Sequence, residues 1–566
     1  MASEAEAKLD QFLQWLQANK VELRGCSIKY SDPEKGFGIY RTADAPEDGV
    51  LVVVPLELAI TPMRVLQDPV IGLECRKLFE DGVVDDRFLI ILFLTVERLL
   101  KNSSWMPYLD MLPESFGNPL WFTDDEIEEL KGTTLYRASE LQKKKLKDIF
   151  DSKVKDLVKK LLLLHGNTDS EVFFQDFLWA NAVFWTRALN IPLPHSYVFP
   201  TIEESETCIP IDTLSETSVD NACGRTSNSI NNLKVNEVDL VGNRFDNAIG
   251  PEQEETVWVE GLVPGIDFCN HSLRPGATWE VDRKGSITGI PVAMYLLSAE
   301  QTPVPNQELT ISYGDKGNEE LLYLYGFVMD NNPDDYLMVH YPVESLQSAP
   351  CSDAKSQLLQ AQNAEMRCLL PRHLLAHGFF PVGSSPKDCN NNVKAAKVCN
   401  YSWSGCRRIP SYLSELIFPE DFLAALRTIS MNDEQIYQVS SMLEELVGSE
   451  EKQPSETEVR TAVWEACGDA GAFQLLVDLL QMKMMELEEG SGTEDSDSQL
   501  LENAHIETTR QSTRYNGDLN GSIKKKYITR NTWSAIVYRR GQKQLTRLFL
   551  REAEHALELS ITEQGG

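Results

Sequence analysis

The segment GIDFCNHS, residues 265–272, follows an apolar run and brings three polar side chains together. Asp267, Asn270 and His271 supply a carboxylate, an amide and an imidazole within one short stretch. At the end of a strand, such groups can converge on a ligand. Taken alone, the segment is interpreted more simply as a hydrogen-bonded turn, because a single histidine is more often structural than catalytic.

Two tyrosines follow about 40 residues later in ELTISYGDKGNEELLYLYGF. The pattern predicts that Tyr313 ends a strand and that Tyr325 ends a short helix. Each could be a core aromatic residue with its hydroxyl group in water, which is common. The two tyrosines gain significance only together with motifs elsewhere in the chain.

Four motifs occur in a fixed order: GFG at 36–38, WTRALNIP at 185–192, NHS at 270–272, and SYG with YGF within 312–327. In this combination the chain resembles the SET-domain methyltransferases, and more narrowly the branch that contains the Rubisco large-subunit lysine methyltransferase and the actin-histidine methyltransferase. The resemblance extends from about Arg24 to Tyr336. The helical remainder resembles the substrate-binding lobe of this branch, notably in FPEDFLAALRTISMNDEQ and YRRGQKQL.

The resemblance implies an α+β fold in two parts. Residues 1–337 are expected to form a knotted β SET domain with a helical insert at about 64–200, and residues 338–566 an all-helical substrate-binding domain. Residues 201–255 hold 12 acidic and 3 basic residues with little periodicity, so we expect a disordered insertion there. A second acidic stretch, at about 486–520, is expected to form a loop. The lysines at 143–147 are expected on a solvated helix face, with a nuclear signal as the alternative.

The resemblance also implies roles for individual residues. S-adenosylmethionine is the implied cofactor, and Tyr313 matches the catalytic tyrosine. The residues that match cofactor-binding positions are Gly36, Phe37, Gly38, Arg187, Asp267, Asn270, His271 and Phe327. Tyr325 and Leu189 are expected to line the substrate channel. One departure is Lys35: the branch often carries Glu immediately before the GxG motif to receive the cofactor's amino group, whereas this chain has Glu34 one position earlier.

The chemistry explains why these residue types are needed. A lysine amine must lose its proton before it attacks a methyl group, which costs roughly 4 to 5 kcal/mol at pH 7. A desolvated channel beside a positive sulfonium lowers this cost, and Tyr313 would orient the acceptor without acting as the base. In the actin-histidine enzyme an Asn aligns with Leu189 and can bind an imidazole. Leu189 cannot, so a buried imidazole nitrogen would lose about 1 to 3 kcal/mol, and lysine is favoured.

Composition limits the partners. With 53 basic and 86 acidic residues the chain has a formal charge of −33, so we expect no direct nucleic-acid binding. The cysteines form no CxxC, CxC or CxxH pair, and no metal site is expected. The amino terminus resembles neither a signal nor a transit peptide, and the longest apolar run is too short to cross a membrane. We expect a monomer, cytoplasmic or nuclear.

Three functions therefore remain open. The first is an S-adenosylmethionine-dependent protein-lysine N-methyltransferase that acts on a non-histone protein. The second is a protein-histidine N-methyltransferase, which Leu189 disfavours. The third is an inactive SET-like scaffold subunit, which Lys35 and the acidic insertions favour and the intact NHS and SYG motifs oppose.

Overall fold

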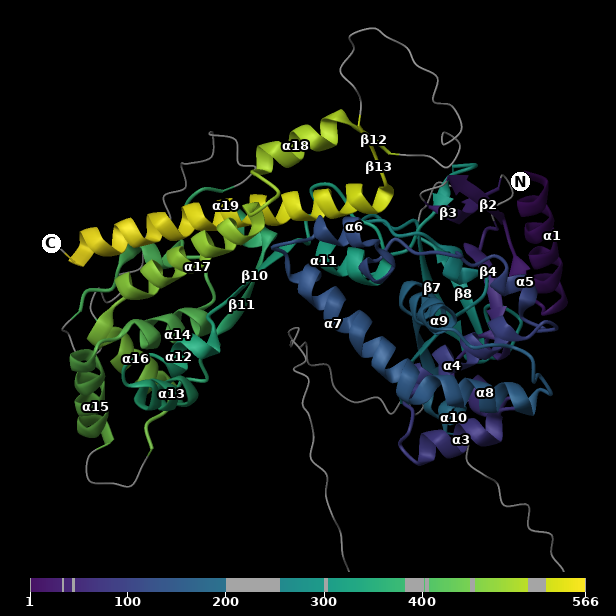
Figure 1. Ribbon diagram of the computed structural model, residues 1–566, viewed down its shortest axis with the longest axis horizontal. Coiled ribbons are helices and arrows are strands. Elements are labelled where there is room, and N and C mark those ends of the chain that lie inside the picture. Colours follow the sequence, from purple (N-terminus) through teal and green to yellow (C-terminus); the bar gives the residue numbers. More distant parts are fainter. Residues whose placement is uncertain are drawn as a thin grey trace, which may run out of the picture.

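The computed structural model describes most of the chain. It covers residues 2–32, 35–42, 46–199, 255–299, 304–381, 402, 407–447, 453–506 and 526–564. Glu34 and nearly all of the expected insertion at 201–255 lie outside these ranges. The described chain forms an amino-terminal part that mixes strands and helices and a carboxyl-terminal part rich in helices, with α19 (Arg530–Gln564) running along both (Figure 1).

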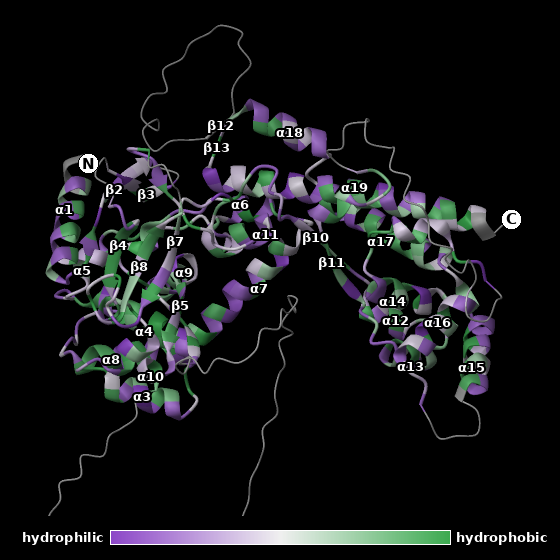
Figure 2. Ribbon diagram, turned by 180° about the vertical axis from the view of Figure 1, so that it is seen from behind, coloured by the Kyte–Doolittle hydropathy of each residue, from purple (hydrophilic) through white to green (hydrophobic). Residues whose placement is uncertain are grey.

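An antiparallel four-stranded sheet forms the centre of the amino-terminal part. Its strands lie in the order β1 (Glu22–Leu23), β4 (Val50–Pro55), β8 (Ala293–Ser298) and β7 (Ala277–Asp282). The run VLVVVP is rich in β-branched residues, which suit a strand, and all of its residues except Pro55 are buried. Figure 2 accordingly shows β4 and β8 as hydrophobic.

Two further sheets carry the motif segments. The first joins β2 (Cys26–Asp32), β3 (Gly36–Arg41) and β9 (Glu308–Leu309), so the GFG motif begins a strand. The second pairs β5 (Leu189–Pro194) with β6 (Thr256–Gly261). The helical insert expected at 64–200 was therefore too long at its end, because the alternating residues of β5 find a partner strand beyond the acidic insertion.

Helices surround these sheets. In chain order they are α1 (Ala2–Ala18), α2 (Pro62–Leu66), α3 (Gly72–Glu80), α4 (Asp86–Leu99), α5 (Met106–Leu109), α6 (Asp124–Glu128), α7 (Thr134–Ile149), α8 (Lys155–Leu164), α9 (Phe174–Arg187), α10 (His195–Val198) and α11 (Asn318–Glu320). The Asp85 side chain caps α4 by accepting the N–H of Phe88, and α4 packs against α9 in the core. No helix among the described residues is long and apolar enough to cross a membrane.

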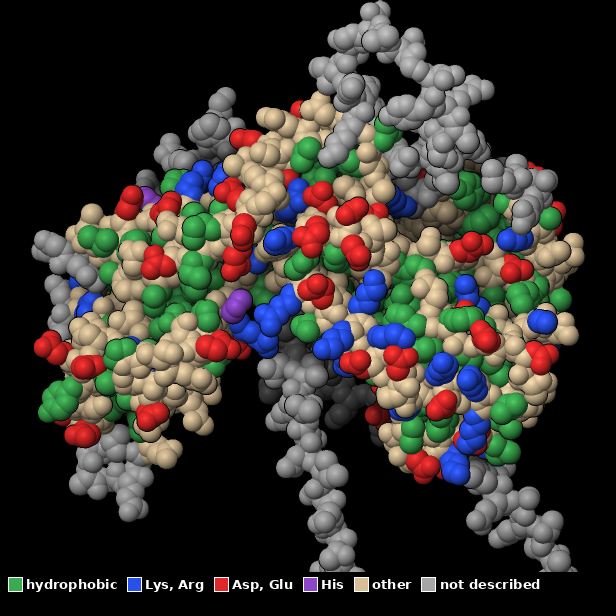
Figure 3. Space-filling view, viewed as in Figure 1, with side chains coloured by type: hydrophobic (Ala, Val, Ile, Leu, Met, Phe, Trp, Pro, Cys, Tyr) green, Lys and Arg blue, Asp and Glu red, His purple; other side chains and the backbone are tan. Residues whose placement is uncertain are grey.

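The lysine cluster lies on α7. Lys143, Lys144 and Lys145 are exposed, while Leu135 and Leu146 of the same helix are buried. Figure 3 shows Lys and Arg side chains gathered along α7 and α8. The segment is thus an amphipathic helix with its lysines in solvent, as expected.

The carboxyl-terminal part has its own core. Its helices are α12 (Val343–Gln347), α13 (Ser352–Ala361), α14 (Glu420–Ser430), α15 (Asp433–Val447), α16 (Glu456–Cys467), α17 (Ala470–Glu488), α18 (Glu494–Asn503) and α19. It is not all-helical, because β10 (Tyr336–His340) pairs with β11 (Arg367–Pro371) and β12 (Ala504–Ile506) with β13 (Lys526–Ile528). Leu337 of β10 packs in this core, so the change of core falls just before residue 336.

The acidic stretch at 486–520 differs from expectation. Residues 486–488 complete α17 and residues 494–503 form α18, while 507–520 lie outside the described residues. The reason is the partner of Asp497: its carboxylate pairs with Arg539 Nη2 at 2.5 Å and with Lys543 Nζ at 2.7 Å, all three side chains being at most 3% exposed. Two cations of α19 thus hold this acid inside the protein.

Candidate active site

The NHS and SYG motifs, 42 residues apart from His271 to Tyr313, lie side by side. The N–H of Ile311 donates to the carbonyl of Asn270 at 2.9 Å, and the N–H of Ser272 donates to the carbonyl of Ile311 at 3.0 Å. His271 and Ile311 thereby form a parallel bridge. This pairing brings the NHS and SYG motifs together.

Tyr313 is fixed at this junction. Its hydroxyl group donates to the carbonyl oxygen of Cys269 at 2.8 Å, and its N–H donates to Nδ1 of His271 at 3.1 Å. Burial raises the pKa of Tyr313 well above its ordinary value. At neutral pH this hydroxyl group is therefore protonated and can donate or orient, but it is a poor base.

Aromatic rings enclose Tyr313. Its ring lies 4.7 Å from that of Tyr325, 5.2 Å from that of His271 and 6.4 Å from that of Phe327. Tyr325 ends the π-helical turn η5 (Leu321–Tyr325), whose cap Gly326 has a φ of +78°. Positive φ favours glycine, so the turn directs both aromatic neighbours toward Tyr313. These rings offer π faces to a cationic partner.

His271 is neutral at this position. Burial lowers its pKa, although Asp334 opposes the shift. Its Nδ1 accepts a hydrogen bond from the backbone, so Nε2 carries the proton of the neutral ring.

Arg187 reaches the same junction from the end of α9. Its Nη1 donates to the carbonyl oxygen of Asp267 at 2.8 Å, and its guanidinium lies 4.9 Å from the ring centre of Phe268. Asp267 belongs to the 3-10 turn η4 (Ile266–Phe268). The expected cofactor residues of two distant motifs thus make direct contact.

The Asp267 carboxyl group is buried beside a tyrosine that sequence reasoning missed. Oδ2 accepts the hydroxyl proton of Tyr108 at 2.5 Å, and Oδ1 accepts the N–H of Gly265 at 3.2 Å. Burial raises the pKa of Asp267 to about 6, although Arg187 and the Tyr108 hydrogen bond favour its ionised form. A perturbed carboxyl group beside a cavity is typical of functional sites. No signal near Tyr108 in the sequence pointed to it.

A cavity of about 350 Å³ opens at this junction. Its walls include Arg187, Leu189, Asp267, Trp279, Tyr313 and Tyr325. This volume suits a small ligand or a long side chain. Leu189 is buried and presents an apolar surface, whereas its neighbour Asn190, which also lines the cavity, is exposed.

The GFG motif lies next to Asn270. Gly36 has a φ of +70°, and Phe37 packs edge-on against the ring of Phe268 at 6.5 Å. A Cβ atom on Gly38 would lie 2.9 Å from Oε1 of Glu308 and 3.2 Å from Nδ2 of Asn270. A larger residue at position 38 would therefore require Glu308 and Asn270 to shift.

A carboxylate, Glu308, meets the Asn270 and GFG segments. It accepts from Nδ2 of Asn270 at 2.6 Å and pairs with Nζ of Lys35 at 3.0 Å. Sequence reasoning missed Glu308, although it lies in the same ELTISYG segment as Tyr313. Lys35 therefore faces a carboxylate rather than an open position.

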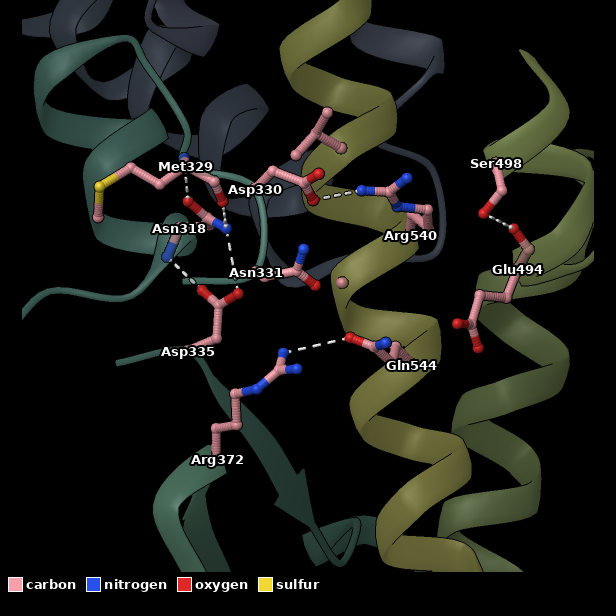
Figure 4. Close-up of a pocket in the computed structure, with 12 residues that line it drawn as sticks. Asn318, Met329, Asp330, Asn331, Asp335, Arg372, Glu494, Ser498, Arg540 and Gln544 are labelled. Atoms are coloured by element: carbon pink, nitrogen blue, oxygen red, sulfur yellow. Dashed lines mark hydrogen bonds and ion pairs between the residues drawn. The ribbon is translucent and has the colours of Figure 1, made fainter. Parts of the chain in front are cut away.

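A second, smaller cavity of about 170 Å³ lies where α18 and α19 approach residues 318–335 (Figure 4). Its polar groups bind one another: Arg540 pairs with Asp330, and Asn318 donates to Asp335. Arg372 donates to Gln544 at 3.2 Å. Because these groups already bind one another, this cavity is not our candidate active site.

The strands, the turn at 265–272 and the aromatic cavity define a fold that solved structures share. The crystal structure of the SET domain of LSMT bound to lysine and AdoHcy aligns with a TM-score of 0.58 and 17% identity, over 98% of this chain and 92% of that chain. The chain thus has the fold of that SET-domain protein.

Curated relatives define the branch. The large-subunit N-methyltransferase of ribulose-1,5-bisphosphate carboxylase/oxygenase from Pisum sativum is 27% identical over 180 residues, which are 32% of this chain and 35% of that protein. The actin-histidine N-methyltransferase of Gallus gallus is 22% identical over 373 residues, 63% of this chain and 46% of that protein. The resemblance to this methyltransferase branch is confirmed. The chain spans less than half the length of these relatives, and no family model matches it.

Proposed function

We propose that this chain is an S-adenosylmethionine-dependent protein-lysine N-methyltransferase that acts on a folded non-histone protein. The observation that carries the proposal is the junction of Asn270–His271 with Tyr313 beside a cavity walled by Leu189. Rubisco and actin-histidine methyltransferases among the relatives support protein methylation as the activity.

The residues present fit the proposed cofactor. A Cβ atom on Gly38 would crowd Glu308 and Asn270, whereas Gly36 faces open space with a φ of +70°, so the backbone at both glycines can approach a ligand closely. Arg187 supplies a cation for the cofactor carboxylate. When bound, S-adenosylmethionine supplies an electrophilic methyl group on a sulfonium.

The chain's own residues would prepare the acceptor. The cavity removes water around the incoming amine and so favours its neutral, nucleophilic form. Tyr313 stays protonated and aims its hydroxyl group toward Cys269, which fixes the ring against Tyr325. An acceptor aligned by this fixed ring attacks the methyl group in line, and Tyr313 does not act as the base.

Leu189 supports lysine as the acceptor. A buried, apolar wall pairs well with the methylene stem of lysine but leaves an imidazole nitrogen without a partner. A protein-histidine N-methyltransferase is the second candidate, because the amide-bearing Asn190 also lines the cavity. The actin-histidine relatives favour the same alternative.

We also infer how the proposed enzyme meets its substrate, and where and in what oligomeric state it works. The helices after residue 338 would dock the substrate protein, as the resemblance implies. A net charge of −33 disfavours direct contact with nucleic acid. The proposed enzyme works as a monomer in the cytoplasm or nucleus.

The experiment is a transfer assay with methyl-labelled S-adenosylmethionine and a lysate from cells that lack the protein. The wild-type chain should label a discrete protein band, and Tyr313→Phe should not. Titration of the cofactor separates the scaffold alternative, because a chain that binds no S-adenosylmethionine cannot be the enzyme. Equal labelling by Tyr313→Phe would remove Tyr313 from the mechanism.

A further inference from the structure

Lys35 and Glu308 form an ion pair beside the GFG strand. Nζ of Lys35 lies 3.0 Å from Oε2 of Glu308, and the backbone N–H of Lys35 donates to Asp32 at 2.7 Å. The hydrogen bond that Lys35 donates to Glu308 raises the pKa of Lys35. Lys35 is therefore a protonated ammonium ion held at a fixed carboxylate.

The two partners differ in how firmly they are held. The Glu308 side chain is 15% exposed and has a second contact, because its Oε1 accepts from Nδ2 of Asn270 at 2.6 Å. The Lys35 side chain is 52% exposed, and its ammonium group binds Glu308. Glu308 is thus held in place by two partners, whereas Lys35 can turn into solvent at little cost.

The position of Glu308 matters because of what surrounds it. Its Oε1 lies where a Cβ atom of residue 38 would point and accepts a hydrogen bond from Asn270. Residues 38 and 270 are both proposed cofactor-binding positions. A primary ammonium group already binds there in the form of Lys35. The α-ammonium of S-adenosylmethionine is the same chemical group, so Lys35 shows that this carboxylate accepts an alkylammonium.

We propose that Glu308 receives the α-ammonium group of S-adenosylmethionine and that Lys35 occupies this carboxylate until the cofactor displaces it. This inference rests on the proposed function. It assigns to Glu308, on a strand 273 residues away in sequence, the task that the resemblance gives to an acid before the GxG motif. Lys35 then competes with the cofactor instead of simply repelling it.

The test is calorimetric titration of the full chain with two ligands. S-adenosylmethionine carries the α-ammonium group, and 5′-methylthioadenosine lacks the whole amino-acid portion. Glu308→Gln keeps an oxygen for Asn270 but removes the charge, and should weaken S-adenosylmethionine binding roughly tenfold or more. Lys35→Ala should strengthen it about two- to fivefold. Binding of 5′-methylthioadenosine should stay within about twofold in both variants.

Lys29→Ala is the matched control, because Lys29 is an exposed lysine of the same sheet that bonds Asn306 rather than Glu308. It should leave both affinities unchanged. In the double variant Lys35→Ala/Glu308→Gln, the gain from removing Lys35 should disappear, because the carboxylate for which Lys35 competes is gone.

Two results would overturn the inference. One is Lys35→Ala binding S-adenosylmethionine no better than wild type, and the other is Glu308→Gln weakening both ligands equally, which would make Glu308 a structural residue. Lys35 is exposed, so its variant should fold even where Glu308→Gln does not. A wild-type chain that binds no S-adenosylmethionine would instead refute the proposed function itself.

Discussion

The stability of Asp267→Asn relative to wild type should be greater at neutral pH than at acidic pH. The Asp267 carboxyl group is 7% exposed and accepts from Tyr108 and Gly265. Burial raises its pKa from 3.8 to about 6, against the effects of Arg187 and Tyr108. Between these values the folded state binds more protons than the unfolded state, so the stability that this group contributes is lost as pH rises through about 6.

The magnitude follows from the two pKa values. Their difference corresponds to about 3 kcal/mol at pH 8, of which about 2 kcal/mol develops between pH 4 and pH 8. An Asn at position 267 has nothing to ionise, keeps an acceptor for the N–H of Gly265, and can donate to the hydroxyl oxygen of Tyr108. The free energy of unfolding of Asp267→Asn minus that of wild type should therefore rise by about 2 kcal/mol across this range.

The assay is urea denaturation of both proteins at several pH values. Asp282→Asn is the control with the opposite sign. Burial of Asp282 is outweighed by N–H donors that include Thr288 and Ile287, and its pKa is lowered to about 2. Its contribution is present above pH 3.8 and is lost as pH falls through about 2, so Asp282→Asn should be less stable than wild type at pH 7. A pH-independent difference between Asp267→Asn and wild type would refute the reasoning.

Three further predictions concern the cavity beside Tyr313 and the contact between α18 and α19. Tyr313→Phe should abolish transfer while its affinity for S-adenosylmethionine, measured by calorimetry, stays within about threefold, because the ring packing remains. Leu189→Asn should lower lysine methylation in the transfer assay, because it places a polar amide against the methylene stem of the acceptor; unchanged turnover would show that Leu189 does not touch it. Asp497→Ala should cost about 3 kcal/mol or more in urea denaturation, because it leaves Lys543 buried without its carboxylate. Glu494→Ala, which breaks a partly exposed pair with Arg547, should cost less than about 1 kcal/mol, and equal losses would contradict the burial argument.

Short sequence motifs predicted the residues whose backbones pair where the NHS and SYG segments meet. Asn270, His271 and Tyr313 could be predicted because each stands in a short local pattern, and the strand pairing of residues 270–272 with 310–312 brings the patterns together. Their roles stay predictions. The knot implied by the resemblance likewise stays a prediction.

Contacts between distant side chains could not be predicted in this way. Tyr108 meets Asp267 across 159 residues, and neither neighbourhood signals the other. The acidic residues of α18 resembled a solvated loop because the cations that neutralise Asp497 come from α19. Local composition describes what a segment can do alone, whereas burial depends on what packs against it.

The most direct test of the central claim is the chemical identity of the methylated residue. Labelled substrate from the transfer assay would be hydrolysed to amino acids and separated against methyl-lysine and methyl-histidine standards. The proposal predicts that the label is found in methyl-lysine and that it disappears with Tyr313→Phe. Label in methyl-histidine would contradict the inference from Leu189 and would make Asn190 the residue that binds the acceptor imidazole. The absence of any labelled protein would contradict the proposal that the chain is a methyltransferase.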